Sequence, residues 1–127
     1  MLIHSCVSVR SIENATLIFE KILGLELMYT FEIGASVLNT LFRIDTPAHA
    51  RVYDTGNSKL EIFVIPDMPS PGGLQHICLG VPDRDAIAEK FIEAGLEVRR
   101  YKRPDGSVVF GVDRDGNLLE LKTVPER

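Results

Sequence analysis

Apolar and polar residues alternate with a period of two in several short segments, and two stretches with helical spacing separate these segments. Residues 2–9 and 75–81 both alternate in this way, as half-buried strands do. Each is followed by a good helix N-cap, Ser11 or Asp83, and then by apolar residues three or four positions apart. Gly24 and Gly95 stand where a left-handed residue ends a helix. Each half of the chain therefore begins with a predicted strand and helix.

Three further strands are predicted after each helix. They cover residues 25–33, 50–54 and 59–65 in the first half, and 96–102, 107–112 and 118–122 in the second. Residues 67–73 are rich in proline and glycine and are typical of a linker. We therefore predict an α+β fold in which residues 1–127 form one domain of two repeated βαβββ modules, 1–66 and 74–127, with curved mixed sheets.

An apolar insertion at residues 34–48 is present only in the first module. Val37, Leu38, Leu41 and Phe42 have helical spacing, which predicts a short helix capped by Ser36. These side chains are too apolar for a free loop. They either form a lid over a cavity or make a satellite contact with the helix layer.

The stretch from Asp113 to Lys122 combines a turn with a strand. Asp113, Gly116 and Asn117 have turn chemistry, because glycine adopts positive φ and Asp and Asn bond their own backbone. Glu120 then lies in mid-strand between leucines. An unpaired buried carboxylate costs free energy, so either Glu120 faces water or a cation lies opposite it.

One histidine and one glutamate recur at matching places in the two modules. His4 and His76 lie in the first strands, and Glu61 and Glu120 lie in the last strands, on the faces opposite the branched aliphatic residues. The helices must cover the aliphatic faces, so the four polar side chains point into whatever the sheets enclose. Two imidazoles and two carboxylates suit a divalent Zn, Ni, Co, Fe or Mn ion.

Taken singly, each of these residues has a simpler interpretation, because a lone His is usually structural or exposed and a lone Glu is usually solvated. Their repetition favours the metal site. His49 has no counterpart in the second module and is interpreted as a loop residue. Cys6 and Cys78 are either spare ligands or small apolar fillers, and the filler role is favoured. Lys122 is a salt-bridge partner, a contact for an anionic substrate or a solvated lysine.

Composition narrows the classes of partner. The net charge is −4 over 127 residues, which disfavours nucleic acid, and the apolar runs are too short to cross a membrane. Two cysteines make no disulfide framework. A cytoplasmic protein that acts on a small molecule is predicted.

The paired modules, the histidines that open them and the stretch that closes the second one resemble the vicinal oxygen chelate superfamily over essentially the whole chain. This superfamily includes glyoxalase I, methylmalonyl-CoA epimerases, ring-cleaving dioxygenases and bleomycin and fosfomycin resistance proteins. The resemblance implies a glyoxalase-like fold around a metal-binding cavity, with His4, Glu61, His76 and Glu120 as ligands. It also implies that Glu120, or Glu61 in the matching position, is the catalytic base.

The activity implied is that of a glyoxalase I-like lyase or isomerase, which moves a proton next to a carbonyl through a metal-stabilised enediolate. A methylmalonyl-CoA epimerase-like enzyme is the first alternative, and a non-catalytic protein that sequesters a small molecule is the second. The exposed edges of each half-open sheet predict a homodimer, with pairing of the modules inside one chain as the alternative.

Overall fold

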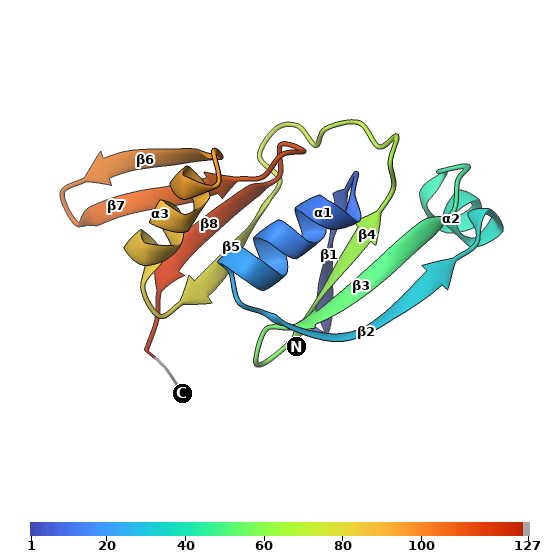
Figure 1. The fold of residues 1–127 in the computed structure, drawn as a ribbon, viewed down its shortest axis with the longest axis horizontal. Coiled ribbons are helices and arrows are strands. Elements are labelled where there is room, and N and C mark those ends of the chain that lie inside the picture. The colour runs from blue at the N-terminus through green and yellow to red at the C-terminus, as the bar shows by residue number, and fades with distance from the viewer. Residues whose placement is uncertain (126–127) are drawn as a thin grey trace. The chain divides into compact units, whose positions relative to one another are not determined.

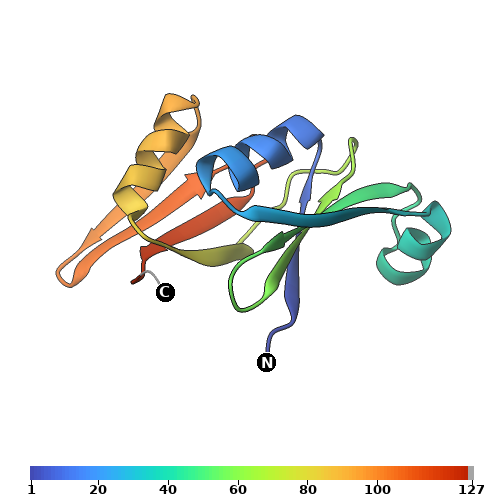
Figure 2. The same ribbon diagram turned by 60° about the horizontal axis from the view of Figure 1, so that its bottom comes forward.

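The computed structural model describes residues 1–125. The chain divides into two compact units, Met1–Pro69 and a second unit that begins at Ser70. In each unit a helix lies across one face of a four-stranded sheet (Figures 1 and 2). The predicted α+β fold of two repeated modules is confirmed. Within residues 1–125 no helix is long and apolar enough to cross a membrane.

The first unit has the sheet order β1-β4-β3-β2, in which β1 and β4 are parallel and the other neighbours are antiparallel. Its elements are β1 (His4–Val9), α1 (Ile12–Ala15), the π-helical η1 (Thr16–Ile22), β2 (Glu26–Ile33), α2 (Ala35–Phe42), β3 (Ala48–Asp54) and β4 (Lys59–Val64).

The helix formed by α1 and η1 has the predicted ends. The Ser11 hydroxyl accepts a hydrogen bond from the Asn14 backbone N–H, and Gly24 follows the helix with φ of 67°. Phe19 is fully buried and its ring centroid lies 5.7 Å from that of Tyr53 on β3. The helix thus covers the face that carries the branched aliphatic residues of β4.

A polar network joins η1 to β3 at the edge of this core. The Glu20 carboxylate accepts hydrogen bonds from Arg51 Nη2 at 2.8 Å and from the Tyr53 hydroxyl at 2.9 Å. Desolvation alone raises the pKa of Glu20, but the hydrogen bonds from Arg51 and Tyr53 outweigh it, and the pKa of this carboxyl is lowered.

The insertion forms the predicted short helix, α2, but its predicted cap is wrong. Gly34 is the N-cap, and Ser36 lies inside the helix. Arg43 ends the helix in the left-handed region with φ of 59°. Leu38 is fully buried in a cluster with Ala48 and Ile65, whereas the other three apolar side chains, Val37, Leu41 and Phe42, are exposed.

The second unit repeats this architecture without the insertion. Its sheet has the order β5-β8-β7-β6, with β5 and β8 parallel. The elements are β5 (His76–Val81), α3 (Arg84–Glu93), β6 (Glu97–Arg103), β7 (Gly106–Val112) and β8 (Leu118–Thr123). Asp83 caps α3 as predicted, accepting from two backbone N–H groups, and Gly95 follows the helix with φ of 77°.

The turn before β8 is built around one carboxylate. Asp113 Oδ1 accepts from the backbone N–H groups of Asp115 and Asn117, and Oδ2 accepts from the Asn117 side chain at 2.8 Å. Gly116 has φ of 88°, so the turn needs the glycine at this point. This buried turn sets the start of β8 and therefore the position of Glu120.

Candidate metal centre

The first predicted pair comes together on β1 and β4. Because these strands are parallel and adjacent, His4 and Glu61 project from the same face, opposite to the helix. His4 Nε2 lies 3.6 Å from Glu61 Oε1, and the Glu61 side chain is only 17% exposed. A mid-strand glutamate at this depth needs a positive partner.

The second pair has the same geometry on β5 and β8. His76 Nε2 lies 3.4 Å from Glu120 Oε1, and the Glu120 side chain is also 17% exposed. Lys122 Nζ is 3.9 Å from the other carboxylate oxygen. The His76 ring lies 5.1 Å from that of Phe110 on β7, which gives the pair an apolar neighbour on the same face.

The His76 ring is oriented by the backbone. Its Nδ1 lies 2.7 Å from the Leu74 carbonyl oxygen. A carbonyl oxygen only accepts, so Nδ1 carries the proton and donates it. A neutral imidazole then points the lone pair of Nε2 toward a carboxylate oxygen, which is also an acceptor. Two acceptors face each other favourably only when a proton or a metal ion lies between them.

The donor set fits a divalent ion. The separations of 3.4 and 3.6 Å are longer than good hydrogen bonds, and they are compatible with two donors that each lie about 2.1 Å from one cation. A ligand histidine whose other nitrogen donates to a carbonyl is the usual arrangement at metal sites. Among the described residues no group of three or more His, Cys, Asp or Glu side chains is placed to hold an ion. Each unit thus contributes a pair, and the joining of the two pairs stays a prediction.

The cysteines lie beside the glutamates in the sheet register. Cys6 pairs with Glu61, and Cys78 pairs with Glu120. Both cysteines are free and exposed, and their role as fillers of an assembled cavity stays a prediction. Desolvation and then the charge of Glu61 raise the pKa of the Cys6 thiol to about 12. The same two causes, with Glu120 as the charge, raise the pKa of Cys78.

His49 does not lie in a loop, and that prediction is wrong. It is in β3, opposite Glu32 of β2, and its Nδ1 lies 2.5 Å from Glu32 Oε1. Its register partner on β4 is Val64, so His49 is on the helix-covered face, opposite to Glu61. It is therefore not part of the candidate metal centre.

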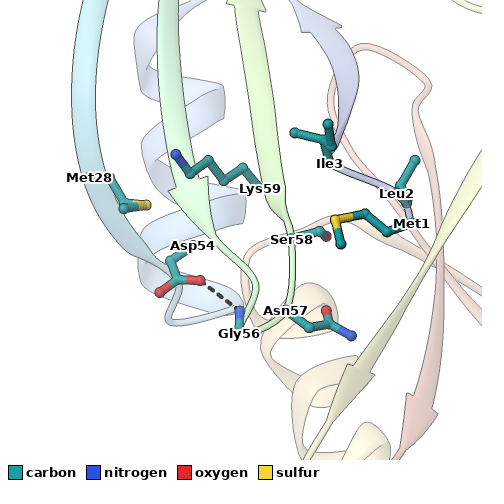
Figure 3. A pocket seen from close by; sticks show the side chains of 9 residues that line it. All are labelled: Met1, Leu2, Ile3, Met28, Asp54, Gly56, Asn57, Ser58 and Lys59. Atoms are coloured by element: carbon teal, nitrogen blue, oxygen red, sulfur yellow. Dashed lines mark hydrogen bonds between the residues drawn. The ribbon is translucent and has the colours of Figure 1, made fainter.

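A separate pocket of about 340 Å³ lies at one end of the first sheet (Figure 3). Residues 1–3 and 56–58, Met28, Asp54 and Lys59 line it. The Asp54 carboxylate accepts a hydrogen bond from the Gly56 backbone at 2.7 Å and so shapes the β3–β4 turn. None of the four predicted ligands lines this pocket, although Lys59 is the register partner of His4.

Two contacts of the site were missed from the sequence. The Leu74 carbonyl that orients His76 comes from a turn just before β5, and backbone acceptors have no sequence signature. Phe110 is an aromatic residue in β7 on the same sheet face as His76, and this aromatic position could have been found from the sequence alternation.

The chain matches a known family along nearly its whole length. The family model described as Glyoxalase/Bleomycin resistance protein/Dioxygenase superfamily matches residues 2–121. A search of curated proteins found no match.

Solved structures share the fold at low sequence identity. A glyoxalase family protein from Enterococcus faecalis is 20% identical, with 95% of each chain covered and a TM-score of 0.72. The fosfomycin resistance protein FosX from Mesorhizobium loti is 21% identical over 98% of this chain and 92% of its own, with a TM-score of 0.67. The trypanothione-dependent glyoxalase I of Leishmania major is 16% identical over 97% of this chain and 86% of its own, with a TM-score of 0.70.

Proposed function

Because this chain belongs to the glyoxalase/bleomycin resistance protein/dioxygenase superfamily, we propose that it is a divalent-metal-dependent lyase or isomerase of the glyoxalase I type. In this proposal His4, Glu61, His76 and Glu120 hold one Ni, Co, Zn, Fe or Mn ion, and the enzyme moves a proton next to a carbonyl group of a small molecule.

The observation that carries the proposal is the arrangement at His76. Its Nδ1–H is committed to the Leu74 carbonyl, while Nε2 faces the Glu120 carboxylate at 3.4 Å. A protonated imidazole would also satisfy this geometry. The recurrence of a His–Glu pair at 3.6 Å in the first unit favours a shared metal role over two unrelated ion pairs.

Each group at the site has its own chemical role in this proposal. A divalent ion supplies Lewis-acid stabilisation of the negative charge that develops on substrate oxygens. Glu120 takes the proton from the carbon next to the carbonyl and returns it to the product, because its carboxylate lies in the site and is held by strands rather than by a loop. Phe110 and the half-buried strand surface around Glu120 keep water away from that proton.

The complete site requires both pairs. We propose a homodimer in which His4 and Glu61 of one protomer join His76 and Glu120 of the partner, and pairing within one chain is the alternative. The support is that each unit contributes a two-ligand half-site on an open sheet face. Two donors hold a transition-metal ion weakly, whereas four make a stable site.

The metal is tested first. Protein loaded with Ni, Co, Zn or Mn and then desalted should retain about one ion per two modules, as measured by elemental analysis. His76→Ala should lose the ion, whereas His49→Ala, which removes the histidine on the opposite sheet face, should retain it. Retention of no metal by the wild-type protein would refute the proposed function.

The reaction is tested second, by following deuterium from solvent into three substrate classes by NMR. Exchange and conversion of a thiohemiacetal support the glyoxalase I type. Exchange restricted to a 2-methyl acyl thioester supports the epimerase alternative instead. Tight binding of a small molecule without exchange in any class supports the sequestering protein. α-Hydroxy ketones are included because they test proton transfer without a thiol.

A further inference from the structure

In the second unit, the sheet row that carries Glu120 runs across all four strands. Cys78 on β5 pairs with Glu120 on β8, Glu120 pairs with Phe110 on β7, and Phe110 pairs with Arg99 on β6. Directly paired residues project from the same face, so Arg99 shares the face of the candidate metal centre. Phe110 lies between them and contacts His76.

Strand β6 is strongly basic, but only part of its charge is on this face. The strand contains Arg99, Arg100, Lys102 and Arg103 and a single acid, Glu97. Arg100 is on the other face, because it forms an ion pair with Asp85 of α3 at 3.1 Å. Alternation places Arg99 and Arg103 on the site face. The chain as a whole is acidic, so this positive edge is a local feature.

The Arg99 guanidinium is held in place on the sheet surface. Its Nε donates to Glu97 Oε2 at 2.7 Å and its Nη2 donates to Glu97 Oε1 at 3.1 Å. This fork uses one edge of the guanidinium. The edge formed by Nη1 is directed away from Glu97 and can make a second charge-assisted interaction. The Arg99 side chain is 56% exposed, so a ligand can reach it.

We propose that Arg99 binds a carboxylate of the substrate, and so selects small molecules that carry a negative group on a short apolar spacer. This inference rests on the proposed metal function, since Glu120 marks the reacting end. Two strand spacings separate Glu120 from Arg99, about 10 Å between their Cα atoms. A short apolar spacer would lie over the Phe110 ring, which stands between Glu120 and Arg99 in this row.

The test uses two hydroxamates, which chelate a metal through two neighbouring oxygens. Succinic monohydroxamate carries a carboxylate two methylenes from the chelating group, and its terminal amide has the same shape without the charge. Calorimetry on Zn-loaded wild-type protein should show tighter binding of the carboxylate, by about tenfold, as expected for a charge-assisted hydrogen bond. This preference should fall as salt concentration rises.

The matched variants are Arg99→Gln and Arg100→Gln, which remove the same charge from opposite faces of one strand. Arg99→Gln should abolish the preference for the carboxylate and leave the affinity for the amide unchanged, which also shows that the variant is folded and holds metal. Arg100→Gln should keep the preference.

Four outcomes overturn the inference. Retention of the carboxylate preference by Arg99→Gln assigns the preference to another cation, such as Lys122 beside Glu120. Equal affinities of the two hydroxamates for the wild-type protein overturn the carboxylate selection alone. Equal loss of preference in both variants shows that only net charge matters, and so rejects the role of Arg99. Binding of neither hydroxamate by protein that retains zinc shows that Glu120 does not mark an open metal site, which removes the basis of the inference together with the proposed function.

Discussion

Substitution of Gly111 by alanine tests how closely α3 is packed on the sheet of the second unit. A Cβ atom at this position would lie 2.6, 2.7 and 2.9 Å from three ring carbons of Phe91. Ordinary carbon–carbon contacts are about 3.6 Å, so the ring would have to retreat by about 1 Å. Phe91 is fully buried, and a close-packed core gives it nowhere to move without displacing its neighbours.

We expect Gly111→Ala to lower the free energy of unfolding by about 1–3 kcal/mol, the usual cost of overpacking. Urea unfolding followed by circular dichroism measures this change. Gly72→Ala is the matched control, because a Cβ there meets no atom within 4 Å and its backbone is not in the left-handed region. The control should be neutral or slightly stabilising.

A double substitution identifies the cause. Phe91→Leu alone should destabilise by leaving a cavity, but in combination with Gly111→Ala the added methyl occupies part of that space. The two changes should therefore be non-additive, with a favourable coupling of about 1 kcal/mol or more. Strict additivity, or a Gly111→Ala protein as stable as the wild type, would refute the packing argument.

Three further predictions address the other parts of the molecule. Glu120→Gln should retain metal but lose turnover by about 10²–10⁴-fold, and Glu61→Gln should lose less. Deuterium exchange by Glu120→Gln at the wild-type rate would contradict the assignment of Glu120 as the base. Leu38→Ala should cost about 2–5 kcal/mol in urea unfolding, whereas Leu41→Ala on the exposed face of α2 should cost under about 0.5 kcal/mol, and similar costs would contradict the observed burial. The lowered pKa of Glu20 means that its stabilisation is present above the ordinary carboxyl pKa of about 4.3 and is lost as pH falls through the lower folded value. Glu20→Gln should therefore have a free energy of unfolding about 1 kcal/mol lower than that of the wild type at neutral pH, and this difference should disappear in acid. A difference that does not depend on pH would contradict the network.

The repeated architecture was predictable because its signals are local. Ser11 and Asp83 cap helices through their own side chains, and Gly24 and Gly95 take the left-handed conformation that ends them. The alternation of apolar residues then distinguishes the helix-covered face of each sheet from the site face. None of these inferences needs a contact between residues far apart in the chain.

The errors arose where distant contacts decide the structure. The sequence predicts a loop at His49, yet this residue belongs to β3 because Glu32 pairs with it from β2 and the neighbouring Ala48 is buried beneath α2. Ser36 is the predicted cap, but α2 begins two residues earlier, at Ala35 after Gly34, and Leu38 lies in its buried cluster. In both cases tertiary packing overrode a reasonable local preference.

The candidate site likewise has a part that the sequence predicts and a part that it does not. Each His–Glu pair was predictable, because parallel pairing of the first and last strands of a module brings matching positions together. The union of the two pairs depends on how two units or two protomers associate, and no local pattern encodes that association.

The two modules also differ in the residue that ends the sheet row of each glutamate. The row that carries Glu61 passes through Val52 and ends at Tyr29, whose ring lies 5.6 Å from the Lys59 ammonium. The corresponding row in the second unit ends at Arg99. The His–Glu pairs are thus duplicated, whereas the row ends are an aromatic ring in one unit and a cation in the other. If the two pairs hold one substrate as proposed, that substrate would contact different side chains in the two units. This difference would orient the substrate so that one glutamate, rather than the other, acts as the base.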